Sequence, residues 1–202
     1  MQVCTAQLVI RPLQRADVDA MAVWQPFADP LLARYNLPDT SATERDDWYG
    51  LRTGDPARRE FAVEASGQVV GRISLRDIGG HTAARLGISI AAEFVNRGLG
   101  TEALTGFLDW YFDEGGFRVL ALDVSASNRR AVHVYQKLGF RHVKDLYRTV
   151  GDEAAVAFLD DPRYTGLRSY FRRRDGQTEA LFYEMELTSE EWQERKEVIR
   201  HG

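Results

Sequence analysis

Residues 91–101, AAEFVNRGLGT, connect a predicted strand to a segment with helical periodicity that begins at Leu99. Gly98 and Gly100 flank Leu99 at the expected start of the helix. Glycine lets the backbone turn tightly and approach an anion closely. The unpaired N–H groups and the dipole of a helix N-terminus favour negative charge at the same place. The stretch therefore predicts a phosphate-binding turn between a strand and a helix, with Arg97 as an additional cation.

Two other interpretations of this turn remain open. Two glycines can form a tight strand-to-helix connection without any ligand. The turn also matches the dinucleotide fingerprint G-x-G-x-x-[GA] through Gly98, Gly100 and Ala103, with Asp123 near the place of a ribose-binding acid. However, the first glycine lies well beyond the strand end at Ile90, whereas that fingerprint follows its strand closely. A dinucleotide-binding oxidoreductase is therefore the weaker alternative.

The segments around this turn predict an α+β fold with a mixed, mainly antiparallel sheet flanked by helices. Alternating or continuous apolar runs predict strands at 7–13, 60–65, 69–77, 84–90, 119–124, 140–150 and 179–187. Helical spacing and capping residues predict helices at 17–24, 43–53, 99–111, 128–137 and about 189–200. We expect a single domain over 1–202, with a long insertion at about 151–177 before the last strand.

Several residues are expected to delimit these elements. Asp17 and Asn128 are predicted N-caps, and Thr188 with Glu191 matches a capping box. The loop Ser66–Gly67–Gln68 predicts a hairpin between two strands of an antiparallel meander. These signals place the boundaries of the elements and carry no information on function.

Composition limits the classes of protein that fit. The 202 residues suit one domain, and neither a signal peptide nor an apolar run long enough to span a membrane is evident. Cys4 is the only cysteine, which favours a reducing, cytoplasmic location. The net charge of −4 argues against non-specific nucleic-acid binding. We expect no metal site, because the histidines show no ligand spacing; they are His81, His133, His142 and His201.

Five arginines occur in the expected insertion with no acidic residue among them. We interpret this stretch as a solvated loop face and favour that over a site for phosphates or an acidic partner. The residues are Arg163, Arg168, Arg172, Arg173 and Arg174.

A second motif follows about thirty residues after the glycine turn. Residues 125–140, SASNRRAVHVYQKLGF, contain N-x-x-A-x-x-x-Y-x-x-x-G-F from Asn128 to Phe140. Together with VNRGLGT at 95–101, this pattern resembles the GCN5-related N-acetyltransferase (GNAT) superfamily, which has the acyl-CoA N-acyltransferase fold. The resemblance covers roughly residues 9–150 and the closing strand.

The resemblance implies an enzyme that transfers an acetyl group from acetyl-CoA to a primary amine by direct attack in a ternary complex. Cofactor contacts would come from the strand end, which would pair with the pantetheine arm, and from the turn, which would hold the pyrophosphate. They are Ile88, Ser89, Ile90, Val95, Asn96, Arg97, Gly98, Leu99, Gly100 and Thr101. One position departs from the family pattern: Val95 stands where Arg or Gln is usual, so the loop would act mainly through its backbone.

The resemblance also implies roles for residues of the second motif. Asn128 would contact the cofactor arm, although it is a good N-cap in any case. Tyr135 would lie near the sulfur and support the departing thiolate, although a purely core role is also open. Asp123, in LDVSASN, occupies the place of a catalytic base in the ribosomal-protein N-terminal acetyltransferases; a structural role for it is equally open. Glu93 is the other candidate base.

The acceptor amine does not follow from these motifs. A protein N-terminus, an amino acid, a polyamine and an aminoglycoside all remain candidates. The strand ending EMEL, followed by Glu191 and Trp192, also resembles the branch that acetylates N-terminal amines.

We expect a small-molecule or peptide amine as partner, no nucleic acid or membrane, and a monomer or homodimer. The insertion is expected to shape the acceptor site or a dimer interface. A non-catalytic acyl-CoA sensor is the alternative from another functional class.

Overall fold

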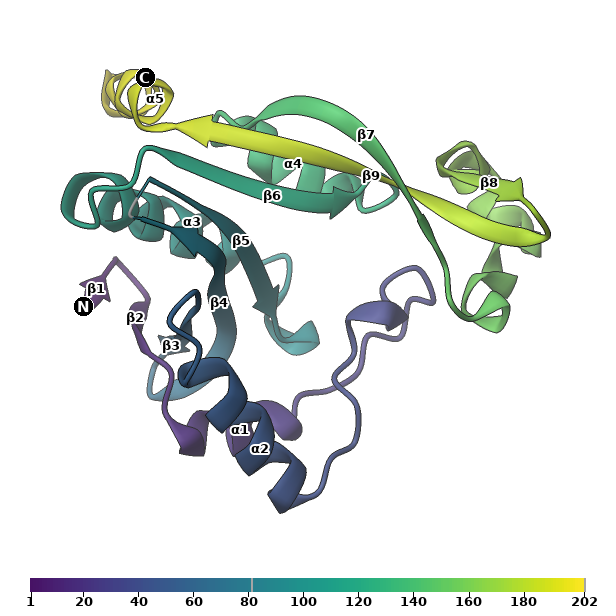
Figure 1. Ribbon diagram of the computed structural model, residues 1–202, viewed down its shortest axis with the longest axis horizontal. Coiled ribbons are helices and arrows are strands. Elements are labelled where there is room, and N and C mark those ends of the chain that lie inside the picture. Colours follow the sequence, from purple (N-terminus) through teal and green to yellow (C-terminus); the bar gives the residue numbers. More distant parts are fainter. Residues whose placement is uncertain (81, 202) are drawn as a thin grey trace. The chain divides into compact units, whose positions relative to one another are not determined.

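The computed structural model describes residues 1–80 and 82–201 (Figure 1), so His81 lies outside the described residues. The chain forms two compact units, and each combines segments that are far apart in the sequence. The first unit consists of Met1–Pro26, Leu37–Ala121 and Thr188–Gly202, and the second of Phe27–Asn36 and Leu122–Leu187. No described helix is long and apolar enough to cross a membrane.

The first unit contains an antiparallel run of five strands in sequence order. They are β1 (Val3–Cys4), β2 (Val9–Pro12), β3 (Arg59–Ala65), β4 (Gln68–Gly79) and β5 (Ala83–Ile90). The β3–β4 hairpin closes through Ser66 and Gly67, whose φ angles are 49° and 78°. Positive φ at both residues is the type I′ geometry that suits the twist of a hairpin, so the predicted turn is confirmed.

The helices of the first unit follow the predicted positions with one correction. They are α1 (Arg15–Ala22), α2 (Ala42–Thr53), α3 (Leu99–Asp109) and α5 (Ser189–His201). Asp17 does not cap α1, as the sequence suggested: Gln14 is the N-cap, and Asp17 lies one turn in, where it accepts the Gln14 backbone N–H at 2.7 Å. The buried Asp17 also pairs with Arg11 at 2.7 Å, which explains why a carboxylate is tolerated there.

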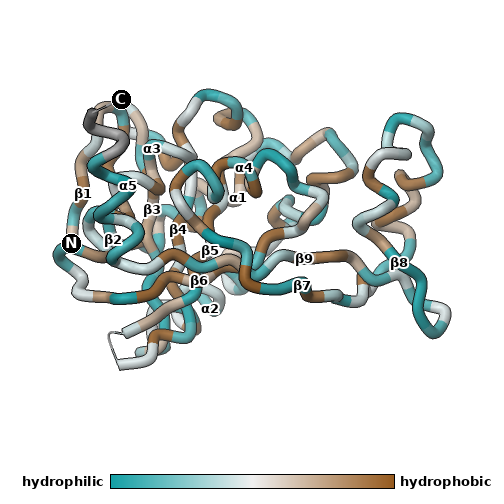
Figure 2. The backbone as a smooth tube through the Cα atoms, turned by 90° about the horizontal axis from the view of Figure 1, so that it is seen from above, coloured by the Kyte–Doolittle hydropathy of each residue, from teal (hydrophilic) through white to brown (hydrophobic). Residues whose placement is uncertain are grey.

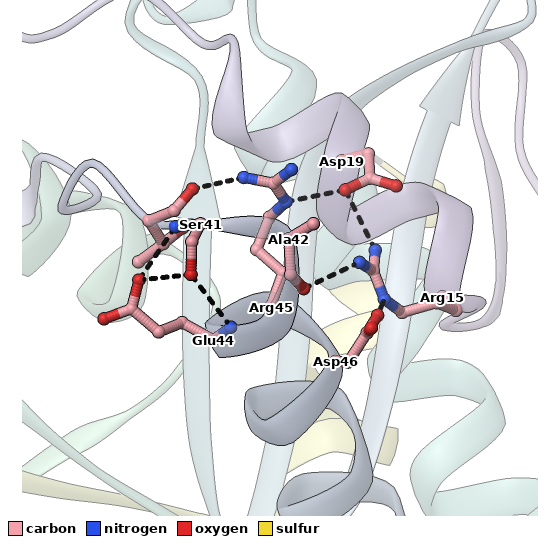
Figure 3. A network of polar contacts seen from close by, with 8 residues as sticks. Arg15, Asp19, Ser41, Ala42, Glu44, Arg45 and Asp46 are labelled. Carbon is pink, nitrogen blue, oxygen red and sulfur yellow. Dashed lines mark hydrogen bonds and ion pairs between the residues drawn. The ribbon is translucent and has the colours of Figure 1, made fainter.

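Polar contacts join α1 to α2 on the outside of the first unit (Figure 3). Asp19 of α1 accepts from Arg15 at 3.0 Å and from Arg45 of α2 at 2.6 Å. Arg15 also reaches Asp46 of α2. These side chains are partly exposed, so each pair contributes little alone, and the network mainly fixes how the two helices lie against each other. Val18 and Met21 of α1 form an apolar cluster with Leu13 and with Ala62 of β3, and Trp48 of α2 packs against it.

The helix that follows the glycine turn continues beyond its α-helical part. After α3 the chain continues in a π-helical turn, η3 (Trp110–Glu114), in which the Gly115 N–H donates to the Trp110 carbonyl at 2.7 Å. Gly116, with φ 70°, then ends the helix as predicted. Phe107 and Tyr111 are fully buried, and the Tyr111 hydroxyl donates to the Val119 carbonyl at 2.8 Å.

The second unit has a strand order that differs from the order of the sequence. Its elements are the later part of β6 (Val119–Ser125), α4 (Arg129–Lys137), β7 (Arg141–Thr149), β8 (Phe171–Arg174) and β9 (Gln177–Thr188). β9 lies between β6 and β7, and it pairs with β7 in antiparallel register from Thr149↔Glu179 to Arg141↔Glu186. The last strand of the sequence is therefore an interior strand of the sheet.

Short helices occur in the segment 25–39 and in the insertion. η1 (Ala33–Tyr35) lies in the segment 25–39, and η4 (Glu153–Asp160) and η5 (Pro162–Tyr170) lie in the insertion. The Tyr164 hydroxyl of η5 donates to Asp29 at 3.0 Å, so the insertion contacts the 27–36 segment within the second unit. The arginine stretch is exposed, as predicted, and β8 has the hydrophilic colour of its arginines in Figure 2. The mixed, mainly antiparallel sheet with flanking helices confirms the predicted α+β class.

Candidate active site

The first unit presents a strand, a turn and a helix start in the predicted order. β5 ends at Ile90, and the short helix η2 (Ala92–Phe94) follows. Asn96 then adopts a φ of 63° and Gly98 a φ of 79°. Gly98 is the N-cap of α3 in the left-handed region, where a side chain is strained. Gly98 is thus required by conformation, whereas a Cβ on Gly100 would make only an ordinary 3.5 Å contact with Ile90.

The start of α3 keeps its backbone donors open to a ligand. The N-cap Gly98 has no side chain, and no side-chain hydrogen bond caps this end. The first N–H groups of an α-helix have no partner inside the helix. Leu99 is buried and anchors the first turn, while Gly98 and Arg97 are exposed. The amides and the positive end of the helix dipole fit a phosphate group, and the apolar side chain of Val95 adds no donor to them.

The Arg97 side chain is oriented by an aromatic contact. Its guanidinium lies 5.3 Å from the centroid of the Phe94 ring. This cation–π contact places a positive charge beside the turn. Arg97 therefore suits a supporting contact with a phosphate.

The edge of β5 supplies backbone groups next to this turn. The parallel β5–β6 ladder pairs residues 83–85 with residues 119–121, all within the first unit. Ile88, Ser89 and Ile90 pair on their other side with residues 71–73 of β4. A strand edge of this kind offers N–H and C=O groups to an extended amide-bearing arm.

Glu93 lies on η2 of the first unit and is partly exposed. One of its carboxylate oxygens accepts the Gln25 backbone N–H at 3.3 Å. The carboxylate makes this one hydrogen bond with the residues that the structure describes, so it can accept another from a ligand.

In the second unit, α4 carries the two residues of the second motif. Asn128 is the N-cap, and its side-chain oxygen accepts the Ala131 N–H at 3.2 Å, which confirms the predicted cap. Tyr135 lies on the buried face of the helix, with its ring packed edge-on against Phe140 at 5.6 Å. His133 is exposed on the other face.

Tyr135 is held in its protonated form. Burial raises the pKa of its phenol well above the usual value of 10, and the nearby Tyr35 raises it further. A protonated phenol is a hydrogen-bond donor, so Tyr135 can donate a hydrogen bond at neutral pH.

Asp123 has a basic partner that sequence reasoning did not predict. One of its carboxylate oxygens lies 2.8 Å from the Arg148 guanidinium on β7. The Asp123 side chain is only 4% exposed, whereas Arg148 is 47% exposed. The Arg148 guanidinium therefore holds one oxygen of a nearly buried carboxylate in place.

A pocket of about 290 Å³ opens in the second unit, lined by the 27–36 segment, the end of β7, the insertion and β9. Its lining includes Arg34, Arg148, Phe158, Phe171 and Phe182. Neither Arg34 nor Arg148 belongs to a motif visible in the sequence. They are isolated arginines in a loop and a strand, and only the fold brings them to one pocket.

A mixed sheet, a glycine turn that opens a helix and a buried tyrosine on the next helix define the class of acyl-CoA-dependent N-acyltransferases. The model of the Acetyltransferase (GNAT) domain family matches residues 7–141. The chain therefore belongs to the GNAT acetyltransferase family and is an acetyl-CoA-dependent N-acetyltransferase. The oxidoreductase interpretation required repeated βαβ units, and the strands that precede the turn are antiparallel instead.

Curated relatives lie within the same family. The chain is 31% identical over 132 residues to spermidine N(1)-acetyltransferase of Escherichia coli K12, which covers 65% of this chain and 71% of the relative. It is 28% identical over 137 residues to the enzyme of the same name from Vibrio cholerae, covering 67% and 79%. A crystal structure of spermidine N-acetyltransferase from Vibrio cholerae with CoA and spermine shares the fold, with a TM-score of 0.69, 21% identity and coverage of 94% and 99%.

Proposed function

We propose that this acetyltransferase acts on a primary amine by direct attack in a ternary complex, with its cofactor bound at the start of α3. The observation that carries this proposal is the left-handed Gly98, which leaves the first amides of α3 without a side-chain cap. Bound acetyl-CoA would supply the acetyl thioester. The amides of residues 98–101 would hold its pyrophosphate, with Arg97 beside them, and the edge of β5 from Ile88 to Ile90 would pair with its pantetheine arm.

We propose that Tyr135 supports the departure of the thiolate. Its phenol stays protonated because it is buried, so it can donate a hydrogen bond at neutral pH. The usual pKa of a thiol is about 8.5, below that of the phenol, so a hydrogen bond is favoured over full proton transfer. Asn128 would contact the cofactor arm through its amide N–H₂, because its oxygen already caps α4.

The attacking amine must lose a proton, because alkyl ammonium groups are protonated at neutral pH. Glu93 and Asp123 are the two candidate bases. The ion pair with Arg148 favours Asp123 as a positioning residue, and the long hydrogen bond to Glu93 leaves that carboxylate freer. We therefore propose Glu93 as the base, acting directly or through one water.

The names of the curated relatives make spermidine the first acceptor to test. The protein is mixed with acetyl-CoA and an amine, and the free thiol released is measured over time. We expect release that depends on the amine. Binding of acetyl-CoA without thiol release from any polyamine, amino acid, aminoglycoside or peptide amine would favour the non-catalytic sensor instead. NADH, as a control, should neither bind nor change the rate.

We also propose a cytoplasmic location, supported by the lone, exposed Cys4, which fits a reducing compartment. The protein would act as a monomer or a homodimer. The insertion contributes residues to the pocket of the second unit, which supports a role for it in shaping the acceptor site.

A further inference from the structure

We infer that the pocket of the second unit binds a carboxylate on the acceptor, with Arg34 as the residue that contacts it, so that the substrates are amines bearing a carboxylate, such as amino acids. This inference rests on the proposed function and narrows its acceptor. Such a preference would distinguish this protein from an enzyme that acts on polyamines, because a polyamine carries only positive charge.

Two guanidinium groups meet at one aromatic ring in this pocket. The Arg34 guanidinium lies 4.9 Å from the centroid of Phe182, and that of Arg148 lies 4.7 Å from the same centroid. Like charges near one ring repel each other unless an anion compensates them. Cation–π contacts with the ring offset part of the repulsion between the two guanidiniums but do not neutralise their charge.

Only one of the two guanidiniums has an acidic partner in the described part of the chain. Arg148 pairs with Asp123 at 2.8 Å. Arg34 contacts the rings of Tyr35 and Phe182 and forms no ion pair with a described residue. Asp152 is the carboxylate of the lining; it accepts the Ala154 N–H at 2.9 Å, caps η4 and forms no ion pair with Arg34. Arg34 therefore provides a guanidinium without an ion-pair partner among the described residues, which can bind a carboxylate and disfavours a polyammonium chain beside it.

The rest of the lining suits an apolar substituent. Phe158 and Phe171 pack edge-on at 6.2 Å, and Phe182 is buried below the two guanidiniums. A volume of about 290 Å³ is close to the lower end for small-molecule sites. An arginine beside an aromatic wall suits an α-amino acid, because its carboxylate and its apolar side chain are attached to the same carbon.

The pocket is connected with the residue proposed to act on the thiolate. Arg34 precedes Tyr35 on η1, and Tyr35 is near enough to Tyr135 to influence the protonation of its phenol. A carboxylate held at Arg34 would therefore lie in the same part of the second unit as Tyr135. Arg34 would act on binding and not on the chemical step.

The test uses matched amines that differ only in the carboxylate. The full chain, saturated with coenzyme A, is titrated calorimetrically with L-lysine and 1,5-diaminopentane, and with L-phenylalanine and 2-phenylethylamine. We expect at least one amino acid to bind about ten-fold more tightly, or better, than its decarboxylated partner, because a charge-assisted hydrogen bond is gained. Arg34→Gln should abolish this difference, and Arg34→Lys should retain part of it.

Arg172→Gln is the matched control. Arg172 is an exposed arginine of the same unit that also lies over an aromatic ring, Tyr147, but it does not line the pocket. This control should keep the wild-type preference. Equal binding within both pairs, a preference unchanged in Arg34→Gln, or tighter binding of spermidine than of either amino acid would overturn the inference. Coenzyme A binding is measured first, and its absence would contradict the proposed function instead.

Discussion

Tyr135 is the residue proposed to support the departing thiolate, and its burial keeps the phenol protonated. We predict that Tyr135→Phe lowers kcat about 100-fold with little change in the KM for acetyl-CoA, because only the stabilisation of the departing thiolate is lost. Burial raises the Tyr135 pKa above 10, so the phenol does not titrate below that pH. The pH profiles of kcat for wild type and variant should therefore have the same shape up to about pH 10. Steady-state assays of thiol release measure both, and an unchanged kcat would remove Tyr135 from the mechanism.

The two candidate bases can be separated by their different partners. We predict that Glu93→Gln lowers kcat at neutral pH about 100-fold or more, because a general base is removed. Asp123→Asn should have a smaller effect on kcat and lower thermal stability, because it breaks the pair with Arg148. The matched control is Arg148→Gln, which breaks the same pair from the exposed side. If Asp123→Asn abolishes turnover while Arg148→Gln does not, Asp123 is the base.

At the scale of elements, Glu102 attaches the N-terminal segment to the first turn of α3. Its carboxylate accepts from the Thr5 hydroxyl at 2.6 Å and from the backbone and side chain of Gln7 at 2.7 and 2.8 Å. The Thr5 hydrogen bond is the main cause of a lowered Glu102 pKa, and Gln7 adds to it. A carboxylate with a lowered pKa stabilises the fold above its ordinary pKa and loses this effect as pH falls.

We predict that Glu102→Gln lowers the free energy of unfolding by about 1–2 kcal/mol at pH 7, because hydrogen bonds to a charged group are lost. The difference from wild type should shrink as pH falls from 4.5 through the lowered pKa, where Glu102 becomes protonated in the folded protein too. Urea unfolding at several pH values measures this dependence. Glu194→Gln, at an exposed carboxylate of α5, is the control and should change little. A difference that stays constant down to about pH 3 would contradict this role.

Local signals were sufficient for most of the elements. The hairpin at Ser66–Gly67 and the N-cap Asn128 lie where turn chemistry and capping placed them. The two-residue strand β1 and the π-helical turn after α3 were missed because neither has a periodic pattern. Asp17 was assigned to the wrong position of α1, because the residue type that favours an N-cap also favours the first turn of a helix.

At the scale of the whole chain, the first unit depends on a segment from the C-terminal end. Trp192 of α5 is fully buried in this unit, and its indole N–H donates to Asp109 of α3 at 3.1 Å. We predict that Trp192→Ala destabilises the protein by about 3–5 kcal/mol, as expected for a large cavity in a core. Val23→Ala, at a side chain that is 74% exposed, should have almost no effect. Thermal unfolding of the two variants tests this, and equal melting temperatures would contradict it.

Relations between distant segments could not be predicted from the sequence. The position of β9 between β6 and β7 depends on pairing across the chain, and periodicity identifies strands but not their neighbours. The pair of Asp123 with Arg148 and the pocket around Arg34 arise in the same way. The glycine turn and the Asn128–Tyr135 motif were visible because their spacing is local to one connection and one helix.

The start of α3, shaped by Gly98, is proposed to bind the cofactor, and calorimetric titration with acetyl-CoA tests this most directly. Gly98→Ala is compared with Gly67→Ala, because both glycines have a similar positive φ and open space where a Cβ would stand, so both substitutions strain the backbone alike. We predict micromolar binding by wild type and by Gly67→Ala, and at least about ten-fold weaker binding by Gly98→Ala. Equal affinity of the two variants would contradict a phosphate site at this turn.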